Sequence, residues 1–536
     1  MTALTFDHLS FTWPDGSVAL DELSGAFSAG RTGLIGRNGS GKTTLLRLAV
    51  GELTPTSGQI SATGTVAYLP QHLTLDTGTR VAELLGVATP LDAVRAIEAG
   101  DADPARFDEI GDNWDIEAKA HAALAEAGLP PGTLERSIGE LSGGEAMLVA
   151  LAGIRLRGAA ITLLDEPTNN LDRDARQLVY QMVRAWRGAL VVVSHDVELL
   201  ELMDNTAELY GNELTTISGP YSQWRAWLDA EQDAARQAEV DARKALAKEK
   251  RQRIEAETKL ARRARYANTD YENKRRPRVV MKLRAREAQV SAGRLRGEVQ
   301  QKEDEARRQL DAAERRVRED PSVRIDLPDP GVAKSRRIAE LGDDYRSWIV
   351  QGPERVALTG PNGAGKTLLL QALATAPGQQ PEADPSAAVR AASTLYTDRI
   401  GYLPQRIDGL DEAASVLEVV RAAAPGTPDS ELTNRLARFL LRGDTAHRPV
   451  SSLSGGERFR VALARLLLAD PPPQLLVLDE PTNNLDLDTV DQLLDALRAY
   501  RGAVLVVSHD EAFLRSFAPD LVLELRDGAL TERPTG

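Results

Sequence analysis

The apolar residues of this chain gather in short runs that predict buried strands. Runs such as Ala189 to Val193 and Ala503 to Val507 are far shorter than the roughly 18–20 consecutive apolar residues of a membrane span. Two further runs, ITLLDE at 161–166 and LLVLDE at 475–480, end in adjacent carboxylates. Because the strands alternate with helical stretches, the pattern predicts an α/β fold built on a parallel sheet.

Residues 229–320 follow a different pattern, rich in Ala, Glu, Arg and Lys with little Gly and one proline, Pro277. Leu283 and Val290 lie seven residues apart, a spacing that places apolar side chains along one helix face. The stretch ANTDYENKRRP, which ends at Pro277, predicts a loop. We therefore expect two antiparallel helices of roughly 35 residues, each about 50 Å long at ~1.5 Å per residue. A solvated charged linker is the alternative.

The chain on either side of this segment repeats itself. Five motifs occur twice, in the same order. They are GRNGSGKTTLL and GPNGAGKTLLL, YLPQ twice, LSGGE twice, LLDEPTNNLD and VLDEPTNNLD, and VVVSHD and LVVSHD. The economical interpretation is two copies of one domain. We predict a first repeat at 1–228, a basic helical hairpin at 229–320 and a second repeat at 321–536.

Charge is distributed unevenly over the 536 residues, which carry a net charge of −14. Residues 229–320 hold 26 Lys+Arg against 19 Asp+Glu, a net of +7, so the remainder carries −21. A concentrated basic segment in an acidic protein predicts affinity for an anion at that segment. The chain has no cysteine, which excludes disulfides, thiolate zinc sites and a cysteine nucleophile. Without a recognisable signal peptide, a cytoplasmic location is expected.

The motif GxxxxGK[ST] occurs at Gly36 to Thr43 and again at Gly360 to Thr367. Its glycines let backbone N–H groups turn toward phosphate oxygens, while its Lys reaches the β- and γ-phosphates and its Ser or Thr contacts Mg²⁺. Two matches, each opening an apolar helix, predict two ATP sites with Mg²⁺. The residues expected to bind nucleotide are Gly36, Asn38, Gly39, Gly41, Lys42, Thr43 and Thr44, and Gly360, Asn362, Gly363, Gly365, Lys366 and Thr367.

The carboxylate pairs at the ends of two strands predict the hydrolytic chemistry. Asp165 and Asp479 suit the Mg²⁺ site, and Glu166 and Glu480 suit polarising the attacking water. An acidic pair at a strand end more often just begins a turn. The upstream phosphate loops and the Pro-Thr that follows each pair favour catalysis here.

LSGGE, together with the Gln of YLPQ, the NNLD motif and SHD, resembles the ATP-binding cassette superfamily. In that family two cassettes pair head to tail, so that the phosphate loop of one faces the LSGGE of the other. The resemblance assigns γ-phosphate contacts to His195 and His509 and a bridging role to Asp172 and Asp486. It assigns binding of the nucleotide held by the opposite cassette to the LSGGE residues, which are Ser142, Gly143 and Gly144, and Ser454, Gly455 and Gly456. It assigns the sensing of Mg²⁺ and of the attacking water to Gln71 and Gln405.

Two cassettes in one chain, with a basic hairpin between them, are similar to the ABC-F family. Members bind the ribosome and push the hairpin toward the peptidyl-transferase centre, as translation factors or as proteins that dislodge antibiotics. The resemblance implies contacts with ribosomal RNA and tRNA, and a monomer whose cassettes pair within the chain. Lys and Arg neutralise RNA phosphates. The expected RNA-binding residues are Lys274, Arg275, Arg276, Arg278, Lys282, Arg284 and Arg286.

Some features depart from the family or leave alternatives open. Both copies read EPTNNLD where the family usually has EPTNHLD, and altered communication is expected rather than lost catalysis. Trp13 or Phe11 is expected to stack on the first adenine, with no matching aromatic in the second repeat. In the first repeat Leu141 lies 70 positions after Gln71, whereas in the second Leu453 lies 48 positions after Gln405. The extra residues form either a small arm or longer helices.

Two rival functions share these motifs. The ATPase of a drug exporter would need a separate membrane partner and has no use for a basic hairpin between its cassettes. A DNA-repair ATPase of the same superfamily carries zinc-binding cysteines or a coiled coil inside a cassette. The sequence does not distinguish antibiotic protection from a general role in translation.

Overall fold

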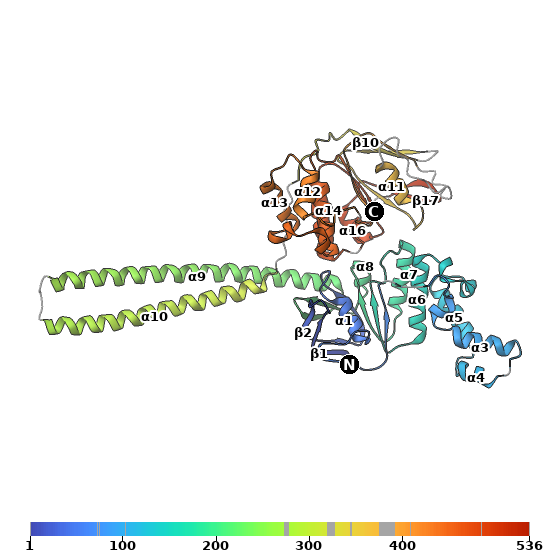
Figure 1. The fold of residues 1–536 in the computed structure, drawn as a ribbon, viewed down its shortest axis with the longest axis horizontal. Coiled ribbons are helices and arrows are strands. Elements are labelled where there is room, and N and C mark those ends of the chain that lie inside the picture. The colour runs from blue at the N-terminus through green and yellow to red at the C-terminus, as the bar shows by residue number, and fades with distance from the viewer. Residues whose placement is uncertain are drawn as a thin grey trace. The chain divides into compact units, whose positions relative to one another are not determined.

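The computed structural model describes residues 2–71, 73, 76–101, 103–272, 278–318, 327–342, 346–374, 392–407, 409–483 and 485–534. By its internal contacts the chain divides into two units, residues 1–221 with 322–536, and residues 222–321. Figure 1 labels their helices and strands. The first unit contains both sequence repeats and the second is a helical hairpin, so the predicted α/β fold with a helical insert is confirmed.

The first repeat is built on a six-stranded sheet whose strands are parallel except for β9 at one edge. Its spatial order is β5 (Val66–Leu69), β6 (Ile161–Asp165), β7 (Ala189–Val193), β3 (Gly30–Ile35), β8 (Asn205–Tyr210) and β9 (Glu213–Ser218). Every residue of β6 and β7 is buried, as expected for a parallel sheet covered on both faces. Leu163 and Leu164 pack into two different apolar clusters, because successive side chains of a strand point to opposite faces.

The second repeat has the same strand order. It consists of β14 (Ile400–Leu403), β15 (Leu475–Asp479), β16 (Ala503–Val507), β12 (Arg355–Thr359), β17 (Leu521–Arg526) and β18 (Ala529–Arg533). Asp479 pairs with Val507 as Asp165 pairs with Val193. The carboxyl ends of the parallel strands therefore bring the two halves of each predicted site to one edge of the sheet.

Each repeat adds a three-stranded antiparallel sheet. The first contains β1 (Thr2–Thr12), β2 (Val18–Ser28) and β4 (Ser57–Ala62), and the second contains β10 (Arg337–Gly342), β11 (Ser347–Gln351) and β13 (Ala392–Leu395). In the first repeat Phe6, Phe27 and Leu20 of this sheet pack in one cluster with Leu45 and Leu46. The small sheet therefore covers the helix that follows the phosphate loop.

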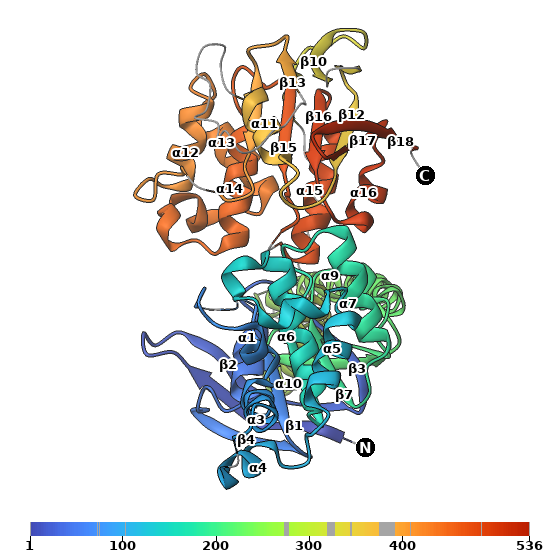
Figure 2. The ribbon, with the colours of Figure 1, turned by 90° about the vertical axis from the view of Figure 1, so that its right-hand side faces the viewer.

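The helices around the large sheets begin at the motifs. In the first repeat they are α1 (Lys42–Ala49), α6 (Gly143–Arg157), α7 (Arg173–Arg184) and α8 (Val197–Leu200). Their counterparts are α11 (Lys366–Ala374), α14 (Gly455–Leu467), α15 (Leu487–Ala499) and α16 (Glu511–Phe517). Figure 2 shows these helices grouped around the sheet of their own repeat.

Between the Gln of YLPQ and LSGGE, the first repeat has two more short helices than the second repeat. This region holds α2 (Val81–Leu85), α3 (Ala88–Glu98), α4 (Pro104–Ile110) and α5 (Ile116–Glu126), whereas the second repeat has α12 (Val416–Ala423) and α13 (Asp429–Leu436). Of the two alternatives, a separate small arm therefore describes the insertion better than longer helices. Its exposed Phe107 and Trp114 rings lie 5.8 Å apart.

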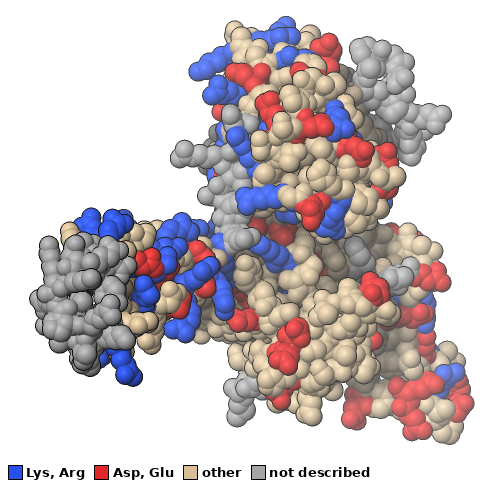
Figure 3. Space-filling view, turned by 60° about the vertical axis from the view of Figure 1, so that its left-hand side comes forward, with Lys and Arg blue, Asp and Glu red and all other residues tan. Residues whose placement is uncertain are grey.

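The hairpin consists of α9 (Tyr221–Glu272) and α10 (Arg278–Arg316). Ion pairs join the two helices at Arg253–Glu303 (2.7 Å) and Arg316–Glu231 (2.8 Å), as expected for antiparallel neighbours. Figure 3 shows blue Lys and Arg side chains clustered on the described part of the hairpin. This is the basic surface that the charge distribution indicates.

The predicted helix lengths are wrong for α9, which has 52 residues rather than about 35. It begins before residue 229 and continues through Tyr266 to Glu272, which the sequence assigns to a loop. Asn, Thr and Asp are only mildly unfavourable in helices, and no Gly or Pro precedes Pro277 in this stretch, so nothing local stops the helix. The expected contacts Lys274, Arg275 and Arg276 lie outside the described residues, as do the side chains of Arg278, Lys282 and Arg284; Arg286 is exposed.

Leu505, in the centre of β16, is fully buried. We expect Leu505→Ala to lower the free energy of unfolding by about 2–5 kcal/mol, because it removes buried methyl groups and leaves a cavity. Urea unfolding followed by circular dichroism measures the change. Leu368→Ala is the control, since that side chain is 41% exposed; equal losses in both variants would contradict the assigned core.

Candidate functional site

The first phosphate loop joins β3 to α1 and is shaped by its glycines. Gly36 has a φ of 151°, and a Cβ there would lie 2.5 Å from the carbonyl oxygen of Leu209, so the loop accepts only glycine at this position. Lys42 is 7% exposed. Its Nζ donates hydrogen bonds to the carbonyl oxygens of Gly36 (2.6 Å) and Arg37 (2.9 Å). The ammonium group is therefore held inside its own loop.

The second phosphate loop has the same construction between β12 and α11. The Nζ of Lys366 donates to the carbonyl oxygens of Gly360 (2.7 Å) and Pro361 (2.9 Å). It also lies 3.0 Å from Nε2 of His509. The structure thus brings together the Lys and His that the sequence assigns to this site.

Each catalytic candidate carboxylate follows its strand in a strained conformation. Glu166 has a φ of 51° and Glu480 a φ of 48°, a region that non-glycine residues rarely adopt. The backbone N–H of Glu166 donates to Val193 and that of Glu480 to Val507, both at 2.9 Å. These bonds hold the glutamates beside His195 and His509, whose Nε2 atoms lie 3.4 Å and 3.3 Å from the respective Oε1 atoms.

Burial governs the charge states at both sites. It raises the pKa of Glu166 to about 8 and the pKa of Glu480 to about 7, with Lys42 and Lys366 opposing the rise. Burial, reinforced by the same lysines, lowers the pKa of His195 and of His509 to about 3. Both imidazoles are therefore neutral at neutral pH. They are suited to hydrogen bonding rather than to carrying charge.

The phosphate loop of each repeat contacts the NNLD segment of the other. The backbone N–H of Asn38 donates to Oδ2 of Asp486 (2.8 Å), and that of Asn362 donates to Oδ2 of Asp172 (3.2 Å). The second carboxylate oxygen of each Asp caps its own helix, at α15 and α7. One carboxylate therefore fixes both a helix start and the neighbouring repeat's loop.

A cavity of about 580 Å³ lies on the first phosphate loop and is lined in part by the second repeat. Its lining from the first repeat includes Trp13, Asn38, Gly39, Gly41, Lys42, Thr43, Thr44, Gln71, Asp165, Glu166 and His195. From the second repeat it includes Ser454, Gly455 and Gly456. A smaller cavity, of about 120 Å³, lies on the second phosphate loop between Gly360, His509 and the first repeat's Asp172 and Arg173.

The serines of LSGGE begin helices. Ser142 and Ser454 are the N-caps of α6 and α14, and each hydroxyl accepts from the N–H of the Glu three residues later. Gly144 and Gly456 then belong to the first helical turn. Free backbone N–H groups at a helix N-terminus favour an anion such as a phosphate.

Of the two aromatic candidates for adenine, only Trp13 lines the cavity. Phe11 is 8% exposed and packs edge-on against the Trp13 ring at 5.0 Å. It belongs to the core of the small sheet. The corresponding segment of the second repeat includes residues 343–345, which lie outside the described residues.

Two further groups at the sites were missed from the sequence. The hydroxyl of Tyr68 donates to Oδ2 of Asp165 (3.3 Å), and Tyr402, its counterpart in the second repeat, lowers the pKa of Asp479 against the effect of burial. The repeated YLPQ motif was the available signal. Arg176, on α7, is the second omission and has no repeated motif to mark it.

The residues present fit ATP with Mg²⁺. Oε1 of Glu166 and of Glu480 is buried, and no group among the described residues donates a hydrogen bond to either atom. The Thr367 hydroxyl lowers the pKa of Asp479 against the effect of burial, so one hydroxyl and one carboxylate lie near each other. Among the described residues no three His, Cys, Asp or Glu side chains form a metal cluster. Mg²⁺ typically takes one or two protein oxygens and completes its shell with substrate phosphates and water.

The fold and sites define a class, the phosphate-loop ATPases with two nucleotide sites at the interface of tandem domains. The family profile described as "ABC transporter" matches residues 20–169 and 346–483, more than half of the chain. The chain belongs to the ATP-binding cassette superfamily and, within it, to the ABC-F family. It is therefore an ATPase with tandem cassettes, and the resemblance predicted from the motifs is confirmed.

Relatives match over nearly the whole chain. The tylosin resistance ATP-binding protein TlrC of Streptomyces fradiae is 32% identical, over 96% of both chains. The ATP-binding protein Uup of Caulobacter vibrioides is 32% identical over 94% of this chain and 74% of its own. ATP-binding cassette sub-family F member 3 of Mus musculus is 30% identical over 92% of this chain and 67% of its own.

A solved structure shares the fold. A chain in the crystal structure of the complex of an archaeal ribosomal stalk protein and the archaeal ribosome recycling factor aABCE1 matches with a TM-score of 0.56 and 19% identity, over 96% of this chain and 87% of that chain.

No helix in the described part of this chain is long and apolar enough to cross a membrane.

Proposed function

We propose that this protein binds two ATP molecules with Mg²⁺ between its repeats and uses their hydrolysis to act on the ribosome in the cytoplasm. The observation that carries the proposal is a basic hairpin inserted between two complete sets of hydrolytic residues. Each phosphate loop already touches the opposite repeat through Asn38 and Asp486, or Asn362 and Asp172. Pairing within one chain needs no second copy.

Each proposed site uses residues of both repeats. Lys42 and the loop N–H groups bind the phosphates of one ATP, and Ser454 with Gly455 and Gly456 close on it from the other repeat. Thr43, Asp165 and Gln71 would hold Mg²⁺, as Thr367, Asp479 and Gln405 would at the second site. When bound, the ion neutralises charge on the β- and γ-phosphates.

The catalytic step follows from the position of the glutamates. Glu166 orients and polarises the water that attacks the γ-phosphorus, and neutral His195 donates to a γ-phosphate oxygen. Glu480 and His509 take these roles at the second site. Trp13 offers its indole face to the first adenine.

The ribosome is proposed as the partner because of the relatives and the hairpin's charge. RNA phosphates attract clustered Lys and Arg, and the first relative named above is a tylosin resistance protein. Growth in the presence of tylosin distinguishes protection from that antibiotic from a general role in translation. A strain that overproduces the protein should grow at a higher tylosin concentration if the role is protection, and at an unchanged concentration if it is general.

The hairpin contact is tested by removing charge at its turn. Changing Lys274, Arg275, Arg276 and Arg278 together to Gln should weaken ribosome binding and reduce the slope of log affinity against log salt by up to about four, roughly one for each lost phosphate contact. Sedimentation with ribosomes at several salt concentrations measures both effects. Hydrolysis without ribosomes should stay within about twofold, because the substitutions remove no residue of the ATP sites.

The control changes four exposed arginines of α10, Arg296, Arg307, Arg308 and Arg315, to Gln. Arg316 is excluded because it pairs with Glu231 across the hairpin. The control should bind ribosomes more tightly than the turn variant. Equal binding by the turn variant and the unchanged protein would remove the main physical support for the ribosomal role.

A further inference from the structure

Arg176 occupies a place at the interface of the repeats that has no counterpart in the second repeat. It lies in the first turn of α7, four residues after Asp172, and its side chain is 12% exposed. The sequences LDRDARQLVY at 171–180 and LDLDTVDQLL at 485–494 align residue by residue. Val490 therefore stands where the first repeat has Arg176, and Leu494 where it has Tyr180.

Within the first repeat, Arg176 forms one hydrogen bond and one ion pair. Its Nε donates to the carbonyl oxygen of Leu171 (3.1 Å), and its guanidinium lies 3.9 Å from Oδ2 of Asp196. The Tyr180 hydroxyl donates to the same Oδ2 at 2.6 Å, and Oδ1 caps α8. Asp196 follows His195, so this network fixes the segment that carries the first-site histidine.

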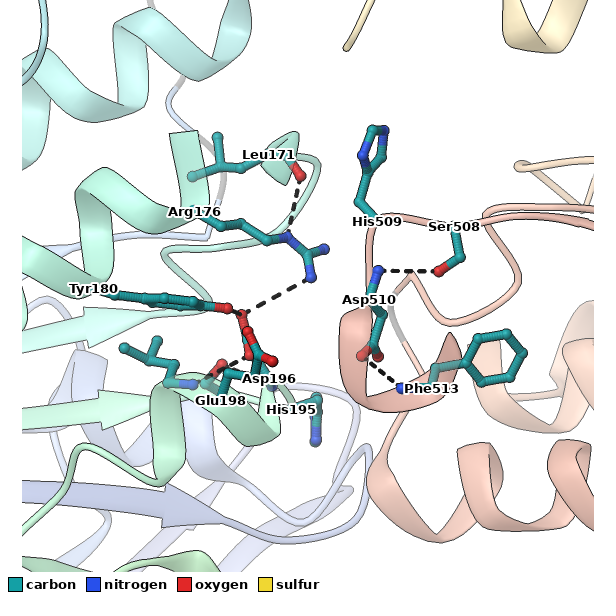
Figure 4. Close-up of polar contacts among 12 residues, drawn as sticks. Leu171, Arg176, Tyr180, His195, Asp196, Glu198, Ser508, His509, Asp510 and Phe513 are labelled. Carbon is teal, nitrogen blue, oxygen red and sulfur yellow. Dashed lines mark hydrogen bonds and ion pairs between the residues drawn. The ribbon is translucent and has the colours of Figure 1, made fainter. Parts of the chain in front are cut away.

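The remaining face of the guanidinium points across the interface. Figure 4 shows Arg176 extended between Asp196 of its own repeat and His509 and Asp510 of the second repeat. Its charge opposes the rise that burial causes in the pKa of Glu480 and of Asp510, and it adds to the lowering of the pKa of His509. One cation of the first repeat thus faces the proposed catalytic groups of the second site.

The first site receives no equivalent cation from the second repeat at this position. Val490 lines the large cavity there, as Arg176 itself does, but neither valine nor leucine can donate a hydrogen bond to Asp510. Asp510 accepts from the N–H of Phe513 and so caps its own helix. At these two aligned positions the halves of the interface therefore differ by one positive charge and one hydroxyl group.

We propose that Arg176 is a positioning residue that acts across the interface on the second hydrolytic site and makes the two ATP sites unequal. It orients the segment Glu480 to Asp510 around the attacking water of the second site. At the same time it anchors Asp196 beside the first site. The inference rests on the proposed roles of Glu166 and Glu480.

The test separates the two sites with single Glu→Gln parents. Glu166→Gln leaves turnover at the second site and Glu480→Gln leaves turnover at the first. Adding Arg176→Gln should lower kcat about tenfold in the Glu166→Gln parent. In the Glu480→Gln parent the loss should be less than twofold, because the Tyr180 hydroxyl and the cap on α8 still hold Asp196. KM for ATP should change less than twofold in both, because the hydrogen bond and the ion pair of Arg176 are with Leu171 and Asp196 and not with a phosphate loop. Arg176→Lys should restore at least half of the lost kcat.

The outcomes are distinct. Equal losses at both sites, or a rise in KM together with the fall in kcat, would mean that Arg176 only maintains the fold, and the proposal would be overturned. No loss at the second site overturns it equally. If neither parent loses turnover relative to the unchanged protein, the catalytic glutamates are wrongly assigned, and the inference on Arg176 falls with that assignment. Val490→Arg with Leu494→Tyr should bring the two site rates closer together, and a wider difference would contradict the proposal.

Discussion

Replacing Glu166 and Glu480 together with Gln should lower ATP turnover by a hundredfold or more, within the range of about 10²–10⁴ that a positioned acid–base group supplies. Gln keeps the size of each side chain but cannot accept a proton from the attacking water. Both glutamates are held at positive φ beside a histidine, so the loss should be chemical rather than structural. ATP affinity should stay within a few-fold of its original value.

The double Gln variant should also stay closed around ATP, since the repeats share each site and the nucleotide is not consumed. With ATP present it should therefore remain on ribosomes and inhibit translation in a cell-free system. A matched control changes two exposed glutamates, Glu98 and Glu213, to Gln and should retain full turnover. If the double variant sediments free of ribosomes with ATP, the ribosomal role is wrong even where the loss of hydrolysis is as expected.

Lys42→Ala together with Lys366→Ala should weaken ATP binding at both sites by about tenfold to a hundredfold, the usual effect of losing a hydrogen bond between charged groups. In the structure each Nζ is held by two carbonyl oxygens of its own loop. This holds the ammonium group beside the space that the phosphate oxygens would occupy. Equilibrium dialysis with labelled ATP measures the number and affinity of the sites.

Each single Lys variant should retain one site of nearly unchanged affinity, because the two loops lie in separate repeats. Lys119→Ala with Lys334→Ala, at two exposed lysines, is the charge-matched control and should bind two nucleotides. Retention of two tightly bound nucleotides by the Lys42 and Lys366 double variant would contradict the assignment of both phosphate loops.

The sequence predicted the parts of this protein that depend on local chemistry. A loop that wraps a phosphate needs glycines such as Gly36 and Gly360 at fixed spacing before a Lys. A strand that ends at a reaction centre places two adjacent carboxylates there, as Asp165 and Glu166 show. Each of these motifs occurs twice, which strengthened the prediction of two ATP sites. The net positive charge of residues 229–320 predicted the basic hairpin. The alternation of strands and helices predicted a parallel sheet, and the structure agrees with it, whereas the strand order and the register came only from the structure.

Helix ends and the contacts between repeats were decided only by the tertiary structure. The sequence placed a loop from Tyr266 onward, but helix α9 continues to Glu272 because weakly unfavourable residues do not stop a helix that is already formed. From the sequence, both Trp13 and Phe11 were candidates for stacking on the adenine. The structure shows that Phe11 packs in the core of the small sheet. Arg176 carried no motif at all. Its partners lie on α8 and in the other repeat, so its role depends on which surfaces fold against each other, and no local pattern of residues encodes that.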